Sequence, residues 1–249
     1  ARYANTPRSW LLRGELGLIG TKQGCDRKGQ CGACTVIVNG EAVLSCLTKV
    51  AALGGAEVIS VEGLGTTDNP HLIQHAFVLA GAVQCGYCIP GMIMAAKALL
   101  DKNPNPSEND IKKALARNLC RCTGYAKIID AVQLAGRFLR GETTPDQIRP
   151  PVDSAMMGTS HRRPTAMLKA CGLAEFAADI KLDDALEIAV TRSTQFHAVI
   201  KSVDTSATEK MPGVVGVMTA KDIKGTNRLM IIFDDQPVLC TDKVRTLGD

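Results

Sequence analysis

Between residues 70 and 140, apolar positions recur with helical spacing in four successive stretches, a pattern typical of amphipathic helices. Pro90 opens the second helix, and Ser107 with Asp110 three residues later forms a capping-box pattern that marks the start of the third. Four such helices with short connections predict a compact bundle, with the methionine and aromatic positions in its core. The apolar stretches lie at 72–83, 93–100, 111–119 and 128–139.

A different pattern precedes these helices. Strand-forming residues on both sides of Asn39-Gly40 predict a hairpin over 34–46, because this dipeptide favours a type I′ turn. One more strand is expected near 57–61, and a helix is expected over 8–20, ending at a glycine. The first sixty residues therefore predict a small α+β unit with a Gly- and Cys-rich loop.

After residue 140 the periodicity stops. Residues 141–163 contain three prolines, with a fourth directly after them at 164, and predict a linker. Beyond it, 185–193, 197–204 and 213–223 have the composition of strands, with a short helical turn at 207–210. The whole chain is therefore expected to be an α+β multidomain protein. Its predicted divisions are 1–62, 63–140, the linker 141–163, and 164–249.

Composition adds few constraints. Of the 249 residues, 45% are hydrophobic and 22% charged, which is an ordinary globular balance. A net charge of +4, without a basic stripe, argues against a nucleic-acid partner. The longest apolar runs, such as "AFVLAGAV", are too short to span a membrane, and the first residues contain no signal-like apolar core. We therefore expect a cytoplasmic protein with no membrane partner.

Ten cysteines change this picture, because eight of them fall into two groups. The first cysteine set has the spacing C-x5-C-x2-C-x11-C, close to the C-x4-C-x2-C start of plant-type [2Fe–2S] proteins. Gly24, Gly29 and Gly32 give this loop the freedom to turn backbone amides toward the sulfurs, and the hairpin returns the fourth thiol. The set consists of Cys25, Cys31, Cys34 and Cys46.

The second cysteine set lies at two junctions between predicted helices. Cys85 and Cys88 separate the first helix from the second, and Cys120 and Cys122 separate the third from the fourth. In an up-and-down bundle these junctions share one end, so the four thiols are expected to converge. A Cys-x-Cys pair is a poor disulfide because the backbone must bend sharply to bring the sulfurs together.

Other interpretations of the cysteines stay open at this point. A four-cysteine zinc site also uses short pairs, and two independent structural zinc ions would need no redox chemistry. Cys171 and Cys240 lie outside both sets and are expected to pack as small apolar side chains. The four histidines are scattered, so we interpret them as surface or structural residues.

Together, "GQCGACTV", "QCGYCIPGMI" and "RNLCRCTGY" resemble the paired [2Fe–2S] signature of the molybdenum hydroxylases, the xanthine oxidase family. "RPTAMLKACGLAEFAADIKL" and "MPGVVGVMTAKDIKGTNR" resemble the start of that family's molybdenum-binding part. Because no flavin domain lies between the helical bundle and this molybdenum-binding part, the domain order is most similar to that of bacterial single-chain aldehyde oxidoreductases. The resemblance implies a ferredoxin-like β-grasp domain at 1–62, a four-helix-bundle [2Fe–2S] domain at 63–140, and the start of an α/β hammerhead domain at 164–249.

The same resemblance implies roles for individual residues. The first cysteine set would hold an outer [2Fe–2S] cluster and the second an inner one, beside a molybdopterin that Gln84 and Cys122 contact. Implied partners are the remaining molybdenum-binding part, in the same or a separate chain, and an external acceptor such as ferredoxin or flavodoxin, with a homodimer possible for the full enzyme. No FAD is expected, because the chain has no dinucleotide-binding fingerprint.

Three departures from the family qualify this resemblance. The first cysteine gap has five residues instead of four, so the loop at 26–30 is expected to bulge. The family's two opening strands have no counterpart before the first helix, and its catalytic glutamate has none either, so no catalytic residue is named. The leading hypothesis is the electron-transfer portion of a molybdenum-dependent aldehyde oxidoreductase. The alternatives are a free-standing iron–sulfur carrier and a zinc-stabilised interaction protein.

Overall fold

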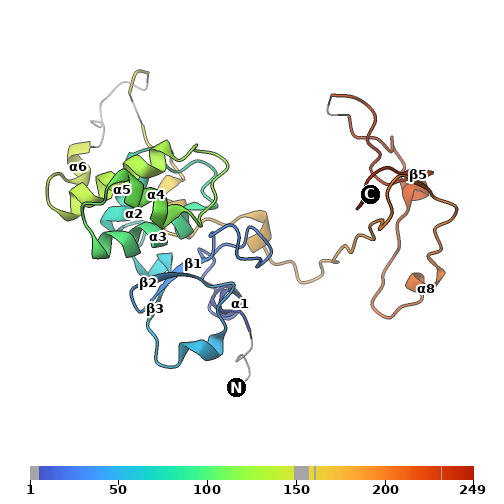
Figure 1. Cartoon of the computed structure of the whole chain (residues 1–249), viewed down its shortest axis with the longest axis horizontal. Coiled ribbons are helices and arrows are strands. Elements are labelled where there is room, and N and C mark those ends of the chain that lie inside the picture. Colours follow the sequence, from blue (N-terminus) through green and yellow to red (C-terminus); the bar gives the residue numbers. More distant parts are fainter. Residues whose placement is uncertain (1–5, 149–156, 160, 231) are drawn as a thin grey trace. The chain divides into compact units, whose positions relative to one another are not determined.

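The computed structural model describes residues 6–148, 157–159, 161–230 and 232–249 (Figure 1). The chain divides into two compact units. The first ends at Lys181, and the second covers Leu182–Asp249. Both cysteine sets belong to the first unit, so its architecture positions the candidate site.

A three-stranded antiparallel sheet forms the N-terminal part of the first unit, in the order β2-β1-β3. β1 (Thr35–Val38) and β2 (Glu41–Leu44) make the predicted hairpin, and β3 (Val58–Ile59) pairs with the other edge of β1. Asn39 and Gly40 both have positive φ, as a type I′ turn requires. The predicted hairpin and third strand are therefore confirmed.

The helix before the sheet is shorter than predicted. α1 (Arg8–Trp10) continues as a wider π-turn, η1 (Leu11–Glu15), and ends there instead of extending to residue 20. Gly17 follows with φ of 67°, a left-handed conformation that cannot continue a right-handed helix. The prediction from apolar spacing was therefore too long at its C-terminal end.

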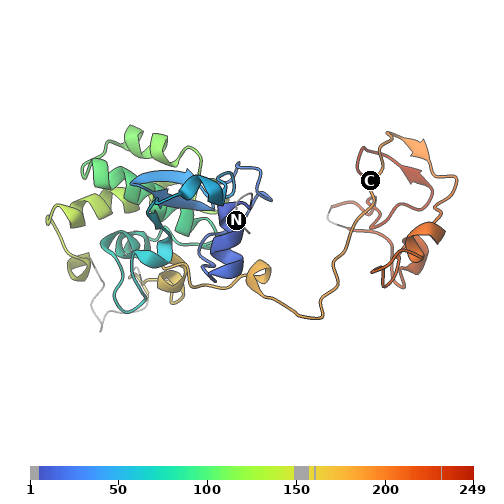
Figure 2. The same cartoon turned by 90° about the horizontal axis from the view of Figure 1, so that it is seen from below.

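Four helices pack together beside the sheet, and α3 lies against β1 and β2 (Figures 1 and 2). Their core is almost entirely aliphatic, methionine and phenylalanine, which confirms the predicted role of the methionines and aromatics. α4 ends four residues before Leu119, whose side chain is 63% exposed, so the prediction that Leu119 continues the buried stripe was wrong. The helices are α2 (Leu72–Leu79), α3 (Ile89–Lys102), α4 (Glu108–Leu115) and α5 (Ala126–Leu139).

The capping box predicted for α4 is present. The Ser107 hydroxyl accepts a hydrogen bond from the Asp110 N–H at 3.2 Å, and the Ser107 N–H donates to the Asp110 carboxylate at 3.1 Å. These bonds satisfy backbone donors that the helix itself leaves without partners.

Replacing Ser107 with alanine is expected to lower the free energy of unfolding by ~1 kcal/mol, the usual cost of losing a serine cap. Urea unfolding of the purified chain would measure the difference. Asn109→Ala is the matched control, because Asn109 lies exposed in the first turn of the same helix, outside the capping box. Equal stability of the two variants would contradict a stabilising cap.

The chain after the four helices returns to cover them. α7 (Ala166–Ala170) packs on α2 and α3, and the following Cys171 is fully buried, as predicted. A short helix, α6 (Pro145–Ile148), and a 3-10 turn, η4 (Ala177–Asp179), flank this segment. α6 lies inside the predicted linker, part of which falls outside the described residues. The predicted domain boundaries stay a prediction.

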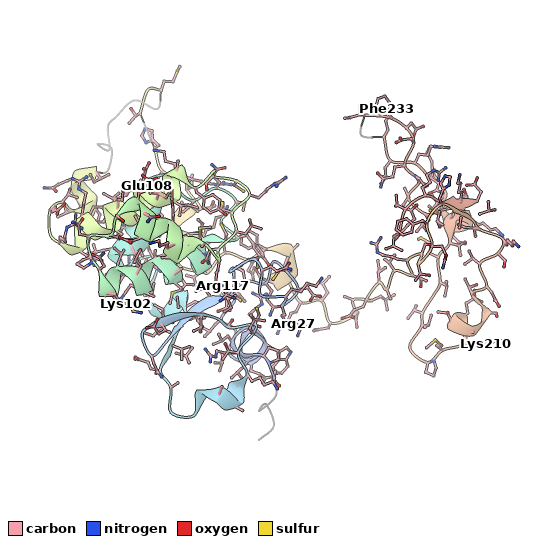
Figure 3. All side chains as sticks on the ribbon, viewed as in Figure 1. Arg27, Lys102, Glu108, Arg117, Lys210 and Phe233 are labelled. Carbon is pink, nitrogen blue, oxygen red and sulfur yellow. The ribbon has the colours of Figure 1, made fainter. Side chains whose placement is uncertain are left out.

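The second unit has little regular structure in its described residues. β4 (Ala198–Val199) pairs with β5 (Lys243–Val244), and α8 (Ser206–Glu209) forms the predicted helical turn. The strands predicted at 185–193 and 213–223 are absent from the described part of this unit, apart from a 3-10 turn, η5 (Ala220–Asp222). Most of their large apolar side chains are exposed, as is Phe233 (Figure 3), so little in the described part of this unit covers the face that a strand would bury.

Within the described residues, every helix is too short or too polar to cross a lipid bilayer.

Candidate functional site

The loop before β1 brings the thiols of Cys25 and Cys31 into contact. The Cys31 thiol donates a hydrogen bond to Cys25, and the Gln30 N–H lies 3.4 Å from the Cys25 sulfur. Burial opposes ionisation of Cys25, but backbone N–H donors from Gln30, Cys31 and Lys28 outweigh it and lower its pKa to about 7. The backbone therefore surrounds this sulfur with donors suited to a negative ligand.

The five-residue gap is accommodated by left-handed backbone. Asp26, Arg27 and Gly29 have φ of 48°, 60° and 71°. Three such residues in one short loop let the backbone turn back within the five-residue gap, so that Cys25 and Cys31 still meet.

The hairpin brings Cys34 and Cys46 together as a second, buried pair. The Ser45 N–H and hydroxyl both donate to the Cys34 carbonyl, at 3.2 and 2.8 Å, which fixes the two ends of the hairpin. Burial, and then the hydrogen bond that the Cys46 thiol donates to Cys34, raise the pKa of Cys46 to about 12. Cys46 also interacts electrostatically with Cys25, so the two pairs of the first cysteine set are neighbours.

The second cysteine set also forms two pairs. Cys88 and Cys120 are buried and share a hydrogen bond, whereas Cys85 and Cys122 are exposed and share another. Burial, followed by the neighbouring Cys120, raises the pKa of Cys88. Electrostatic interactions of Cys88 with Cys85, and of Cys122 with Cys120, place the pairs side by side. The predicted convergence of the two helix junctions is therefore observed.

Tyr125 and Thr123 support this site, and the sequence reasoning did not identify them. The Tyr125 hydroxyl accepts a hydrogen bond from the Cys120 N–H at 2.8 Å and donates to the Asn118 carbonyl at 3.1 Å. The Thr123 hydroxyl lies 3.2 Å from the Cys120 sulfur and lowers the pKa of that thiol against the effect of burial. Their position beside the Cys-x-Cys in "CRCTGY" was the available signal.

The two cysteine sets are joined by direct contacts. The Leu119 N–H, one residue before Cys120, donates to the Cys31 carbonyl at 2.9 Å. On the other side, the Tyr87 hydroxyl donates to the Gln23 carbonyl at 2.9 Å. Hydrogen bonds thus connect the loops that carry the two sets at two separate points.

Gln84 and Cys122, the two residues implied as pterin contacts, are both exposed. Cys122 belongs to the exposed Cys85–Cys122 pair, and Gln84 directly precedes Cys85 in the chain. Among the described residues, no three His, Cys, Asp or Glu side chains are grouped around one point as a single metal ion would need.

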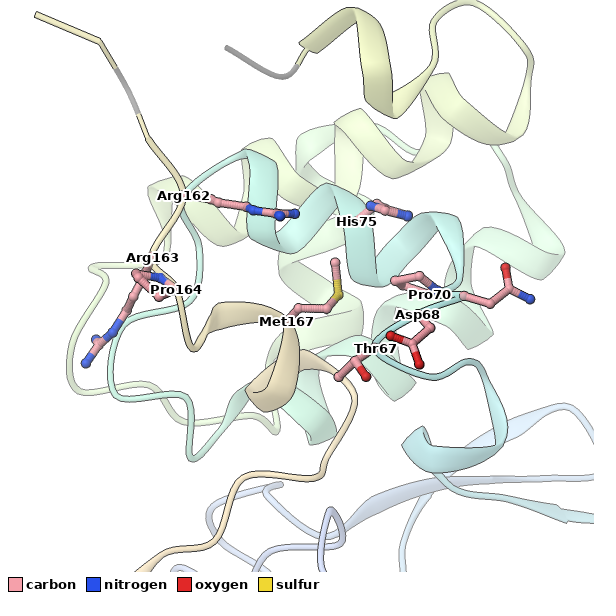
Figure 4. Close-up of a pocket in the computed structure, with 9 residues that line it drawn as sticks. Thr67, Asp68, Pro70, His75, Arg162, Arg163, Pro164 and Met167 are labelled. Atoms are coloured by element: carbon pink, nitrogen blue, oxygen red, sulfur yellow. The ribbon is translucent and has the colours of Figure 1, made fainter. Parts of the chain in front are cut away.

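A separate cavity of about 330 Å³ lies between the start of α2 and the segment before α7 (Figure 4). Arg162 extends toward His75 within it, whereas Arg163 points away. None of the cysteines lines this cavity. Its lining residues are Thr67, Asp68, Asn69, Pro70, His75, Arg162, Arg163, Pro164 and Met167.

Comparison with known proteins gives two family matches. Residues 60–133 match a [2Fe-2S] binding domain, and residues 171–249 match the a/b hammerhead domain of aldehyde oxidase and xanthine dehydrogenase. The small FeS subunit of nicotinate dehydrogenase from Eubacterium barkeri is 52% identical over 125 residues, covering 50% of this chain and 79% of that subunit.

Two longer relatives match nearly the whole chain. The aldehyde oxidoreductase of Megalodesulfovibrio gigas is 42% identical over 256 residues, covering 96% of this chain. The crystal structure of the Desulfovibrio desulfuricans aldehyde oxidoreductase superposes with a TM-score of 0.87 and 43% identity over 99% of this chain. The chain spans only 28% and 29% of these two relatives. With its cysteine pairs and these matches, the chain belongs to the molybdenum hydroxylase (xanthine oxidase) family.

Proposed function

We propose that the two cysteine sets hold two [2Fe–2S] clusters, and that the chain is the electron-transfer portion of a molybdenum-dependent aldehyde oxidoreductase. Its role is to carry electrons from a molybdopterin centre, through the second set and then the first, to an external acceptor. The proposal places ligands at Cys25, Cys31, Cys34 and Cys46, and at Cys85, Cys88, Cys120 and Cys122.

The pairwise arrangement of the thiols is the observation that carries this proposal. A [2Fe–2S] cluster places two protein ligands on each of two irons, so its four sulfurs fall into two pairs. A structural zinc ion instead draws all four sulfurs around one point. In both sets, hydrogen bonds between thiols join sulfurs within pairs, whereas the sulfurs of different pairs interact only electrostatically. This favours iron–sulfur clusters over zinc.

The surrounding residues suit an iron–sulfur cluster and a molybdopterin in different ways. When bound, the clusters supply one-electron transfer, and a molybdopterin supplies two-electron oxidation of an aldehyde or heterocycle. Backbone N–H groups from the loop at 24–33 donate to the first set and stabilise negative charge there. At the second set, the exposed Gln84 and Cys122 offer the surface where the pterin would lie.

The same proposal assigns the finer architecture and partners. The sheet unit is taken as a ferredoxin-like β-grasp domain and α2–α5 as a four-helix-bundle domain, in a cytoplasmic protein whose ten thiols are all free. The remaining molybdenum-binding part is the expected partner, with a ferredoxin or flavodoxin as acceptor. The match of 171–249 to a hammerhead domain argues against a free-standing carrier, which has no use for that segment.

Low-temperature EPR of the dithionite-reduced chain tests the proposal. Two distinct signals with about two spins per chain are expected, one from each [2Fe–2S] centre. Cys122→Ala should abolish the signal of the second set and leave that of the first, because the sets share no ligand.

Cys240→Ala is the matched control, since Cys240 lies outside both sets and both signals should persist. Bound zinc with no EPR signal would contradict the proposal. Loss of both signals from a folded Cys122→Ala variant would contradict two independent centres.

A further inference from the structure

Two cations meet at the exposed side of the second cysteine set. The Gln84 carbonyl accepts a hydrogen bond from the Arg163 guanidinium at 2.7 Å and another from the Lys169 ammonium at 3.3 Å. Gln84 directly precedes Cys85, and an electrostatic interaction links Lys169 to that cysteine. Nothing in the proposed roles of the cysteines accounts for this pair of charges.

The position of Lys169 is fixed by packing. Lys169 belongs to α7, which Ala166 and Ala170 anchor in the core beneath α2 and α3. Its aliphatic stem lies across Gly86, where a Cβ would come within 2.4 Å of the Lys169 Cδ. Gly86 also has φ of 89°, so the loop between Cys85 and Cys88 is shaped to receive this side chain.

Holding two like charges together has a cost. Burial lowers the pKa of Lys169, and the neighbouring Arg163 lowers it further, while Cys85 opposes both. Negative charge close by offsets this cost. A centre with four thiolate ligands supplies that charge, and each added electron increases it.

We propose that Arg163 and Lys169 are positioning residues that raise the reduction potential of the cluster at the second cysteine set. The inference rests on the proposed function. In the reduction step one electron from a mediator enters the centre and no bond is made or broken, so one negative charge is added. Fixed positive charges favour that product over the oxidised form. They also hold the Gln84 carbonyl, and with it the loop that leads into Cys85.

A redox titration followed by EPR tests this in the full chain. For Arg163→Gln combined with Lys169→Gln, the equilibrium constant for one-electron reduction of the second-set cluster should fall about tenfold, ~59 mV for a one-electron couple. The first-set cluster should not shift. Lys169→Arg keeps the charge and should retain the wild-type potential. Each single glutamine variant should give part of the shift, and these decide the question if the double variant assembles no cluster.

Arg162→Gln is the matched control, because Arg162 lies next to Arg163 but extends into the cavity beside His75 (Figure 4). Its loss should leave both potentials unchanged. An unchanged second-set potential in the glutamine variants, an equal shift at both clusters, or an equal shift with Arg162→Gln would overturn the inference. A wild-type chain without the second-set signal would overturn the proposed function itself, and this inference with it.

Discussion

Replacing Asp179 with asparagine is expected to destabilise the first unit by about 3–5 kcal/mol, the usual effect of removing one partner of a buried ion pair. The Asp179 carboxylate lies 2.6 Å from the Lys22 ammonium and 2.5 Å from the Arg13 guanidinium. The side chains of Asp179 and Lys22 are each only 1% exposed. The variant would leave the Lys22 ammonium buried without the carboxylate that contacts it, and only a longer-range electrostatic interaction with Glu62 would remain.

The remaining contacts of Lys22 do not replace that carboxylate. The Lys22 ammonium also donates to the Ala174 carbonyl at 2.9 Å and lies 4.7 Å from the centre of the Phe176 ring. These contacts orient the ammonium but bring no negative charge. Because Phe176 packs edge-on against Tyr87, the network also ties the segment after α7 to the loop of the second cysteine set.

The effect of Asp179→Asn should depend on pH in a defined direction. Burial opposes ionisation of Asp179, but hydrogen bonds from Lys22, Arg13 and the Phe176 N–H outweigh it and lower its pKa. A carboxyl with a lowered folded pKa stabilises the fold above its ordinary, unfolded pKa, and this contribution is lost as the pH falls through the folded value. The stability curves of wild type and variant should therefore approach each other in acid.

Urea unfolding at several pH values would measure both effects. Asp130→Asn is the matched control, because Asp130 pairs with Lys127 at the surface and its loss should cost no more than ~1 kcal/mol. A loss below ~1 kcal/mol for Asp179→Asn at neutral pH, or a loss independent of pH, would argue against the buried ion pair.

This ion pair also marks the limit of what the sequence could predict. Cys-x2-Cys spacing, the Asn39-Gly40 turn and the Ser107 cap are local signals. They correctly indicated the hairpin and the start of α4, and they grouped the cysteines as the structure brings their thiols together. Lys22 and Asp179 lie 157 positions apart, and no spacing pattern links them. A contact between residues so distant depends on packing that no local pattern encodes.

The two strand predictions that were wrong have a related physical cause. Strands were predicted at 185–193 and 213–223 from composition, but β-forming residues need a partner surface to cover one face. In the described part of the second unit, Ile188 is 90% and Val215 73% exposed, so no such surface is present there. Helices α2–α5 were predicted better because their apolar stripes find one another within a single unit.

Replacing Gly32 with alanine is expected to lower the free energy of unfolding by about 3 kcal/mol, for two separate reasons. Gly32 has φ of 68°, and a left-handed alanine costs ~1–2 kcal/mol. A Cβ at this position would also lie 2.2 Å from the Arg117 carbonyl oxygen and 2.8 Å from the Asn118 Cα. Backbone atoms cannot turn aside as a flexible side chain can, so the two segments must separate.

That separation would break the contacts between the two cysteine sets. Asn118 donates to the Gly32 carbonyl at 2.9 Å, and the Leu119 N–H donates to the Cys31 carbonyl at the same distance. Each such bond contributes ~1 kcal/mol. In α3, a Cβ on Gly91 would lie 2.4 Å from the Gly32 carbonyl oxygen. The absence of a Cβ at both glycines therefore permits the close approach of the loop that carries Gly32 to its neighbours.

Gly40→Ala is the control that separates the backbone strain from the steric clash. Gly40 has φ of 82°, but a Cβ added there would meet no described atom within 4 Å, so its substitution carries the backbone strain without the clash. Urea unfolding should give Gly32→Ala a loss larger than that of Gly40→Ala by ~2 kcal/mol, the share of the two hydrogen bonds. Equal losses would mean that the cysteine loops do not depend on this approach. A larger loss at Gly32 would show that the close approach of the two cysteine loops requires a residue without a Cβ at this position.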